Sequence, residues 1–269
     1  MLEKRIVTSI LIVTLVAIIM FFFPNWVFAL LASIMVGFAL SEFFSLVEKK
    51  GVSVYKYLAV TIGMLIPVIV YLEMGTEGYF DIEPFFIVFA CLFIFVLQFI
   101  RRDSSQALTS IAVTMFGLLY IAWFFSFFIK IKFLPQGTLL VAFLVLTTKM
   151  GDIGAYLVGT SAGKHNLIPR ISPKKTIEGT VGGLIFSVAS AVASKAYLPG
   201  FSYTHLLTLG ALLGILAQVG DLAESLIKRD CEAKDSGTGL SGFGGFLDLI
   251  DSLLFTAPIF YFYMKVVIR

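Results

Sequence analysis

The chain has 269 residues, of which 59% are hydrophobic and only 14% are charged, with a formal net charge of +3. A soluble domain does not need so much apolar surface, and apolar runs long enough to cross about 30 Å of hydrocarbon recur along the whole chain. The two cysteines, Cys91 and Cys231, lie in a predicted span and a predicted loop, which excludes a disulfide framework and a cysteine metal site.

The apolar runs predict an all-α, polytopic integral membrane helical bundle of about nine transmembrane helices, because backbone in lipid must satisfy its own hydrogen bonds. The strict alternation that a transmembrane barrel requires is absent. We interpret the first run as a retained helix, because it lacks a small-residue cleavage site. The expected spans are 6–23, 25–45, 55–73, 84–100, 107–129, 137–158, 179–198, 204–226 and 247–267.

The loops on the two sides of these spans differ in charge. Most lysines and arginines of the short loops fall on one side, which the positive-inside rule assigns to the cytoplasm. Nine spans then place the C-terminus outside. We therefore expect a multi-pass protein of the cell's inner (plasma) membrane.

The two halves of the chain differ in polar content. Residues 1–135 form five plain spans in which we identify no intramembrane charge, so we interpret them as a scaffold and a candidate cavity for a lipid chain. Residues 136–269 carry the polar motifs and are the expected catalytic region. No inverted repeat is evident, which argues only modestly against a transporter.

Four acidic residues flank the polar segment between the last two spans. Asp221 and Glu224 end one predicted helix, and Asp248 and Asp251 begin the next. Residues three apart share a helix face, and carboxylates near lipid are costly and usually functional. Carboxylate oxygens select a hard divalent cation such as Mg²⁺. The alternative is a set of salt bridges to the basic residues between the two helices.

Two further polar elements accompany the acidic residues, and the first of them favours phosphate. In the run from Ser172 to Gly179, Lys174 and Lys175 precede a helix that Thr176 could cap, and a helix N-terminus favours an anion. The alternative is a basic loop beside the membrane. Asp152 lies inside the sixth span with Lys149, either as a buried ion pair or as a contribution of a third helix to the same polar site.

These motifs together resemble one known family. The segments SPKKTIEG, GDLAESLIKR, KDSG, GFGG and LDLIDS, in this order, resemble the phosphatidate cytidylyltransferase (CDP-diacylglycerol synthase) family over about residues 149–260. The resemblance implies transfer of a cytidylyl group from CTP to phosphatidate, giving CDP-diacylglycerol and pyrophosphate, with the active site facing the cytoplasm. It also implies Mg²⁺ as cofactor, with a second cation left open. CTP and phosphatidate in the bilayer are the expected partners, nucleic acid is not, and a homodimer is left open.

The resemblance also assigns residues. The metal carboxylates map onto Asp221, Asp248 and Asp251, which with Lys228, Lys234 and Asp235 form the expected catalytic set. The expected substrate-phosphate-binding residues are Ser172, Lys174, Lys175, Arg229 and Asp152.

The C-terminal signature of this chain diverges from the family pattern. Phe243 and Leu249 stand where the family has a histidine and an arginine, which leaves open any acid–base role of that histidine. The three metal carboxylates remain, which argues for an active enzyme. The alternatives are another CTP-dependent lipid-phosphorylating membrane enzyme and a cation transporter without nucleotide chemistry.

Overall fold

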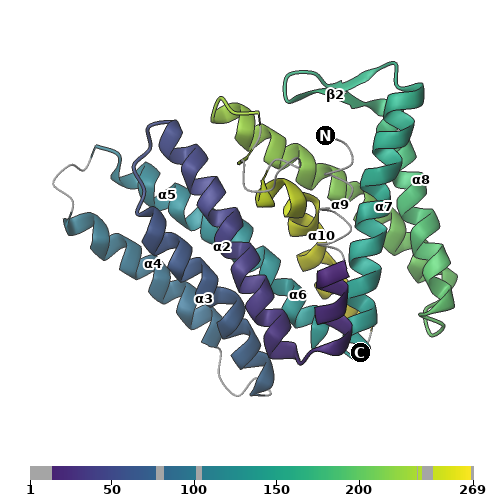
Figure 1. Cartoon of the computed structure of the whole chain (residues 1–269), viewed down its shortest axis with the longest axis horizontal. Coiled ribbons are helices and arrows are strands. Elements are labelled where there is room, and N and C mark those ends of the chain that lie inside the picture. The colour runs from purple at the N-terminus through teal and green to yellow at the C-terminus, as the bar shows by residue number, and fades with distance from the viewer. Residues whose placement is uncertain (1–13, 77–81, 101–104, 235, 238–244, 268–269) are drawn as a thin grey trace. The chain divides into compact units, whose positions relative to one another are not determined.

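The structure is a computed structural model that describes residues 14–76, 82–100, 105–234, 236–237 and 245–267 (Figure 1). Eight helical segments within these residues are long and apolar enough to cross a membrane, and they correspond to the second through ninth predicted spans. Of the first predicted span, residues 14–23 are described, with 14–22 helical, and residues 6–13 lie outside the described residues. The chain is therefore a multi-pass helical membrane protein.

The chain divides into two compact units. The first unit contains residues 1–133 and 231–249, and the second contains residues 134–230 and 250–269. The described residues of 231–249, which are 231–234, 236, 237 and 245–249, thus belong with the N-terminal helices, although they follow the second unit's helices in sequence. The predicted division into a scaffold, 1–135, and a catalytic region, 136–269, concerns function and stays a prediction.

The first unit is built from long apolar helices. They are α2 (Asn25–Lys49), α3 (Lys56–Gly75), α4 (Ile82–Ile100), and a continuous span of α5 (Ala107–Gly117), a π-helical turn η1 (Leu118–Trp123) and α6 (Phe124–Lys132). Helices α2 and α3 run side by side (Figure 1), and the Ser33 hydroxyl on α2 donates to the Met64 carbonyl on α3 at 2.6 Å. Inside a membrane such a bond gives the hydroxyl its partner.

Two carboxylates bear on the expectation that these spans carry no intramembrane charge, one inside the predicted span 25–45 and one just before the predicted span 84–100. Glu42 lies on α2, and Glu83 lies in the first turn of α4. Glu83 is buried, forms an ion pair with Lys130 at 2.7 Å and accepts a hydrogen bond from the Trp123 indole. A buried charge persists in an apolar bundle when it is paired in this way.

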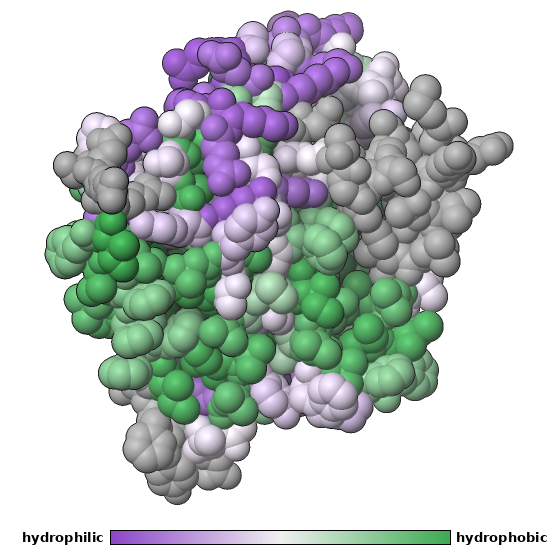
Figure 2. Space-filling view, turned by 60° about the vertical axis from the view of Figure 1, so that its left-hand side comes forward, coloured by the Kyte–Doolittle hydropathy of each residue, from purple (hydrophilic) through white to green (hydrophobic). Residues whose placement is uncertain are grey.

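The outer surface of the helices is apolar. Helix α4 exposes large hydrophobic side chains, among them Phe85, Phe89, Leu92 and Phe99. Figure 2 shows hydrophobic side chains gathered over a broad area of one face of the molecule. Exposed apolar area of this extent is costly in water, whereas acyl chains cover it without cost.

The second unit contains α7 (Gly137–Ala162), a hairpin of β1 (Asn166–Ile168) and β2 (Ser172–Thr176), α8 (Ile177–Ala193) with the short turn η2 (Ser194–Ala196), α9 (Tyr203–Asp230), and most of α10 (Phe246–Val267). The hairpin is antiparallel, pairing Ile168 with Ser172 and Asn166 with Thr176. Helices α7 and α8 lie side by side (Figure 1). A Cβ on Gly182 would lie 2.5 Å from Val158, so this glycine allows the close approach of α7 and α8.

Candidate active site

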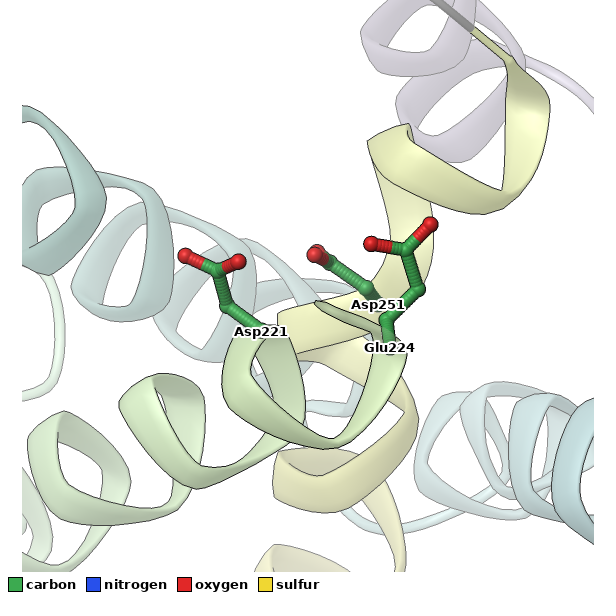
Figure 3. Close-up of side chains that lie close together, drawn as sticks. All are labelled: Asp221, Glu224 and Asp251. Carbon is green, nitrogen blue, oxygen red and sulfur yellow. The ribbon is translucent and has the colours of Figure 1, made fainter. Parts of the chain in front are cut away.

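Three carboxylates converge from two helices of the second unit. Asp221 and Glu224 lie one turn apart on α9, and Asp251 lies on α10. One oxygen from each carboxylate lies within 4.8 Å of the other two. Figure 3 shows the three side chains gathered between the two helices. Glu224 and Asp251 are buried, whereas Asp221 is partly open, so the cluster can be reached at Asp221.

The close crossing of α9 and α10 depends on Gly220, which directly precedes Asp221. A Cβ at Gly220 would lie 2.7 Å from the Asp251 carbonyl oxygen and 3.1 Å from the Ser252 Cα. Only glycine therefore fits at position 220, because any larger side chain would collide with the backbone of α10. Asp251 in turn accepts a hydrogen bond from the Ser252 backbone N–H at 2.5 Å, which fixes its Oδ1.

Two lysines partly balance the cluster. Lys175 Nζ lies 2.7 Å from Asp221 Oδ2, and Lys228 Nζ lies 2.5 Å from Glu224 Oε2 one helical turn away. A third ammonium group, that of Lys149 on α7, also acts on Asp251 and Asp221. It pairs with Asp152, so four carboxylates and three ammonium groups still leave a negative site. Salt bridges, the alternative considered from the sequence, are thus present, but Asp221 draws its partner from the hairpin rather than from the segment after α9.

The donor set fits a hard divalent cation. Asp221, Glu224 and Asp251 supply only carboxylate oxygens, which are the ligands that Mg²⁺, Mn²⁺ and Ca²⁺ prefer and that zinc sites use less often. The sequence places Glu224 on the same helix face as Asp221, but the predicted metal ligands, Asp221, Asp248 and Asp251, do not include it. Its spacing of three residues from Asp221 was the signal.

The hairpin carries the lysine run to the cluster. The expected basic loop is a two-stranded ribbon in which Lys175 reaches Asp221, whereas the neighbouring Lys174 is exposed. Successive residues of a strand point to opposite faces, which explains why the two lysines differ. The predicted cap is confirmed, because Thr176 Oγ1 accepts from the Gly179 N–H at 3.1 Å.

The ends of the hairpin are tied to the helices. The Glu178 carboxylate accepts from the backbone N–H groups of Lys164 at 3.0 Å and His165 at 3.2 Å, which closes the base of the ribbon. Arg229 Nε, near the end of α9, donates to the Ile171 carbonyl at 3.2 Å, next to Ser172. One of the predicted phosphate-binding groups therefore also holds the hairpin turn.

Asp152 connects α7 to α10. Its Oδ2 pairs with Lys149 Nζ at 3.0 Å and accepts from the Ser252 hydroxyl at 3.0 Å, and that hydroxyl also accepts from Lys149 at 3.0 Å. The ion pair and the contribution of a third helix, which the sequence offered as alternatives, are both present. Ser252, adjacent to Asp251, was missed by sequence reasoning, since a serine inside an apolar helix carries little signal.

Asp248 belongs to the first unit. Its Oδ2 accepts from the Gly245 N–H at 2.7 Å and the Ser236 hydroxyl at 2.8 Å, both from the segment that precedes α10. Lys234 is exposed in the same segment and lines a cavity of about 1040 Å³. Asp235 and Phe243 lie outside the described residues. Leu249 is half-buried on α10, and the metal-ligand role of Asp248 stays a prediction.

Known proteins are similar to this chain in sequence. The model of the cytidylyltransferase family matches residues 3–267. The chain is 42% identical over 147 residues to a phosphatidate cytidylyltransferase of Bacillus subtilis, covering 54% of each chain. It is 40% identical over 153 residues to the uncharacterized protein YnbB of Escherichia coli, covering 57% of this chain and 51% of that one.

A third relative is covered almost completely. The chain is 28% identical over 290 aligned positions to a phosphatidate cytidylyltransferase of Synechocystis, covering 97% of this chain and 96% of that one. The alignments thus span about half the length of the first two relatives and nearly all of the third. Since the family match extends over both compact units, this chain belongs to the cytidylyltransferase family.

Proposed function

We propose that this protein transfers a cytidylyl group from CTP to phosphatidate, releasing pyrophosphate and leaving CDP-diacylglycerol in the membrane. The observation that carries the proposal is the convergence of Asp221, Glu224 and Asp251 with two lysines at the ends of apolar helices. Relatives named phosphatidate cytidylyltransferase support the choice of substrates. The proposed site lies at the cytoplasmic surface of the inner membrane, where soluble CTP and a lipid phosphate can meet.

Magnesium is the proposed cofactor. Asp221, Glu224 and Asp251 would hold it, and Asp248 is a further proposed ligand. When bound, Mg²⁺ supplies charge neutralisation of the phosphates and polarisation of the α-phosphate. Since Mg²⁺ uses only one or two protein carboxylates when it also binds substrate phosphate, not every acid of the cluster needs to touch it.

The side chains of the protein would hold the two phosphates in line. A phosphatidate oxygen forms a bond to the α-phosphorus of CTP, the bond from that phosphorus to the bridging oxygen breaks, and pyrophosphate leaves. The attacking oxygen is already anionic, so the step requires no general base. Lys175 and Lys228 lie beside the acidic cluster, where their ammonium groups can pair with the incoming phosphate oxygens.

The other proposed phosphate ligands surround this pair. Lys174 is exposed on β2, Ser172 begins the strand, and Arg229 lies at the end of α9. Lys149 and Asp152 would act indirectly on the acidic cluster. Both hydrogen-bond to Ser252, which is adjacent to Asp251, and so would help to orient the Asp251 carboxylate. A homodimer remains a proposal for the assembly.

The test is incubation of detergent-purified protein with CTP and phosphatidate, with and without Mg²⁺, followed by separate measurement of lipid and nucleotide products. We expect equal amounts of CDP-diacylglycerol and pyrophosphate. Release of CDP with a phosphorylated lipid would instead indicate a kinase. Cation flux into liposomes without CTP turnover would indicate a transporter, and either result would overturn the proposal.

A further inference from the structure

Helix α2 carries a polar stripe at its C-terminal end. Ser41, Glu42, Ser45 and Lys49 recur at helical spacing in an otherwise apolar helix. These four side chains form one wall of the cavity of about 1040 Å³ in the first unit. The opposite wall is formed by residues 231–234, 236 and 237, which belong to the signature segment before α10. A purely structural span has no need of such a stripe facing that segment.

Glu42 reaches the start of α10. Its Oε2 accepts a hydrogen bond from the Leu247 backbone N–H at 3.0 Å, in the first turn of the helix. The Ser236 hydroxyl lies 3.3 Å from the same oxygen and 2.8 Å from Asp248 Oδ2. Glu42 and Asp248, which are far apart in sequence, are therefore joined through one serine, and both accept from backbone groups at the N-terminus of α10.

The surroundings leave little freedom for the Glu42 side chain. A Cβ on Gly237 would lie 2.7 Å from Glu42 Oε1, and a Cβ on Gly245 would collide with Glu42 Oε2 and the Ser236 hydroxyl. The rings of Phe38 and Phe246 stack at 4.7 Å, one turn away from Glu42. The two glycines and the stacked rings pack closely around the Glu42 side chain and keep its carboxylate next to the start of α10.

We propose that Glu42 is a positioning residue, which orients the Asp248 carboxylate by holding Ser236 and the first turn of α10. The proposal rests on the proposed function, in which Asp248 binds the cation. Outer groups that orient a metal-binding carboxylate commonly change metal affinity or activity by 10- to 100-fold. It also gives α2, in the N-terminal region, an indirect role, through Ser236 and the start of α10, in orienting Asp248.

The test compares Glu42→Ala, Glu42→Gln and Ser236→Ala with Glu48→Gln, a control on the exposed face of the same helix. Binding of Mn²⁺ is measured in the absence of substrate, and the kinetic constants for CTP are measured separately. We expect Glu42→Ala to weaken Mn²⁺ binding about 10-fold or more and to lower kcat, with KM for CTP nearly unchanged. Glu42→Gln keeps one acceptor oxygen for the Leu247 N–H, so its loss should be smaller.

The variants also separate positioning from folding. Ser236→Ala removes only a hydroxyl, and because it acts on the same carboxylate, its effect should combine with that of Glu42→Gln less than additively. Mn²⁺ affinity in all three variants equal to that of Glu48→Gln would overturn the inference. If the wild type binds Mn²⁺ but forms no CDP-lipid, the proposed function fails, while the binding comparison still decides the role of Glu42.

The cavity itself carries a second inference. Besides Glu42 and the serines, it is lined by Lys49 and Lys50 from the end of α2 and by Lys234 from the signature segment. Three ammonium groups from two distant segments border one volume, which is as large as the upper range of ordinary ligand pockets. Lysines at the edge of a polar cavity favour phosphate as the ligand.

We infer that this cavity binds a phosphate-bearing substrate, with Lys49 and Lys50 as phosphate-binding residues. The inference deepens the proposed function, because CTP and phosphatidate share this chemistry. Two glutamates, Glu42 and Glu232, also line the cavity, but they are outnumbered by its three lysines. A Glu42 oxygen is engaged by the Leu247 N–H, and Glu232 is exposed. Exposed lysines at the mouth would act most strongly at low ionic strength.

The double variant Lys49→Gln with Lys50→Gln tests this inference, with Lys265→Gln as a matched control on an exposed lysine of α10. Binding of labelled CTP and of inorganic pyrophosphate is measured by equilibrium dialysis, and KM is measured for each substrate. A rise of about fivefold or more in KM for CTP, with weaker pyrophosphate binding, assigns the cavity to the nucleotide. A rise for phosphatidate alone assigns it to the lipid phosphate. Values matching the control in all arms would overturn the inference.

Discussion

The two compact units each hold carboxylates, but they hold them in opposite ways. In the second unit, Asp221, Glu224 and Asp251 face one another within 4.8 Å, and lysines together with one backbone N–H, that of Ser252, offset their charge in part. In the first unit, Asp248 and Glu42 accept hydrogen bonds from backbone N–H groups and a shared serine. The second unit thus brings three negative charges close together, whereas in the first unit each carboxylate has its own hydrogen bond from a backbone N–H.

This difference predicts which carboxylates would be stabilised most by a bound cation. Hydrogen bonds from N–H groups stabilise the ionised form of Asp248 without any ion. Two unit charges at 4.8 Å repel by roughly 3 kcal/mol at an effective dielectric constant of 20, so three facing carboxylates repel one another, and the neighbouring lysines offset that repulsion only in part. The acidic cluster is therefore expected to depend on a cation for its geometry, whereas the Asp248 network should be formed beforehand.

Removal of divalent cations should have the largest effect. We expect EDTA to reduce formation of CDP-diacylglycerol to background and added Mg²⁺ to restore it, because the acidic cluster is then left with its own repulsion. Mg²⁺ should also raise the midpoint of thermal unfolding. EDTA saturated with Mg²⁺ beforehand is the control. Full activity in EDTA would contradict the assignment of the cluster as a cation site.

The variants Asp251→Asn and Asp248→Asn should separate the two kinds of carboxylate. Asparagine at 251 keeps an acceptor for the Ser252 N–H but removes a charge from the cluster, so activity should fall by about 10² to 10³ with little loss of stability. Asparagine at 248 also places an amide donor among the donors from Ser236 and Gly245, so stability should fall as well.

Activity assays and unfolding midpoints in detergent check this pair. Equal destabilisation by both substitutions would mean that the acidic cluster, like the Asp248 network, is satisfied without an ion. Wild-type activity in Asp248→Asn would remove Asp248 from the set of metal ligands and leave it a role at the start of α10 alone.

The sequence was sufficient for the helices and for most of the acidic cluster. Apolar runs of 19 residues or more admit few structures in lipid, which is why eight spans are found where they are expected. Asp221 and Glu224 could be placed on one helix face because residues three apart on an α-helix lie on the same side. Asp251 was predicted for the same cation, and α10 brings it to them.

The contacts between distant segments could not be read from the sequence. Ser252 and Ser236 act through partners that only folding brings near, and neither has a local pattern of its own. Glu42 did have a local pattern, because it forms a polar stripe with Ser41, Ser45 and Lys49 in an otherwise apolar helix. The hairpin was missed for a different reason: three- and five-residue strands are too short for a periodic signal.

Lys175→Gln should have a smaller effect, which raises the affinity of the acidic cluster for a cation but lowers activity. Removal of the ammonium group 2.7 Å from Asp221 makes the cluster more negative, so affinity for Mn²⁺ should rise by about threefold to tenfold. Activity should fall by about tenfold if the same lysine binds phosphate. Lys164→Gln, on an exposed lysine just before the hairpin, is the control. Weaker cation binding in Lys175→Gln would mean that the ion pair orders Asp221 more than it competes with the cation.

Gly220→Ala should have the smallest effect on chemistry and should act through packing. Alanine normally favours a helix over glycine by about 1 kcal/mol, so an exposed position should gain stability. At Gly220 the new Cβ would lie 2.7 Å from the Asp251 carbonyl oxygen, a backbone atom that can move only with α10. Separation of α9 and α10 would cost about 1–3 kcal/mol and would widen the acidic cluster.

The matched control is Gly75→Ala, at the end of α3, where a Cβ has no neighbour within 4 Å. The unfolding midpoint should fall for Gly220→Ala and stay level or rise for Gly75→Ala. Because the strain lies at the crossing that brings Asp251 to Asp221, Mn²⁺ affinity should fall together with the midpoint in Gly220→Ala. A lower midpoint with unchanged Mn²⁺ affinity would mean that the crossing of α9 and α10 supports the fold but does not set the geometry of the cluster.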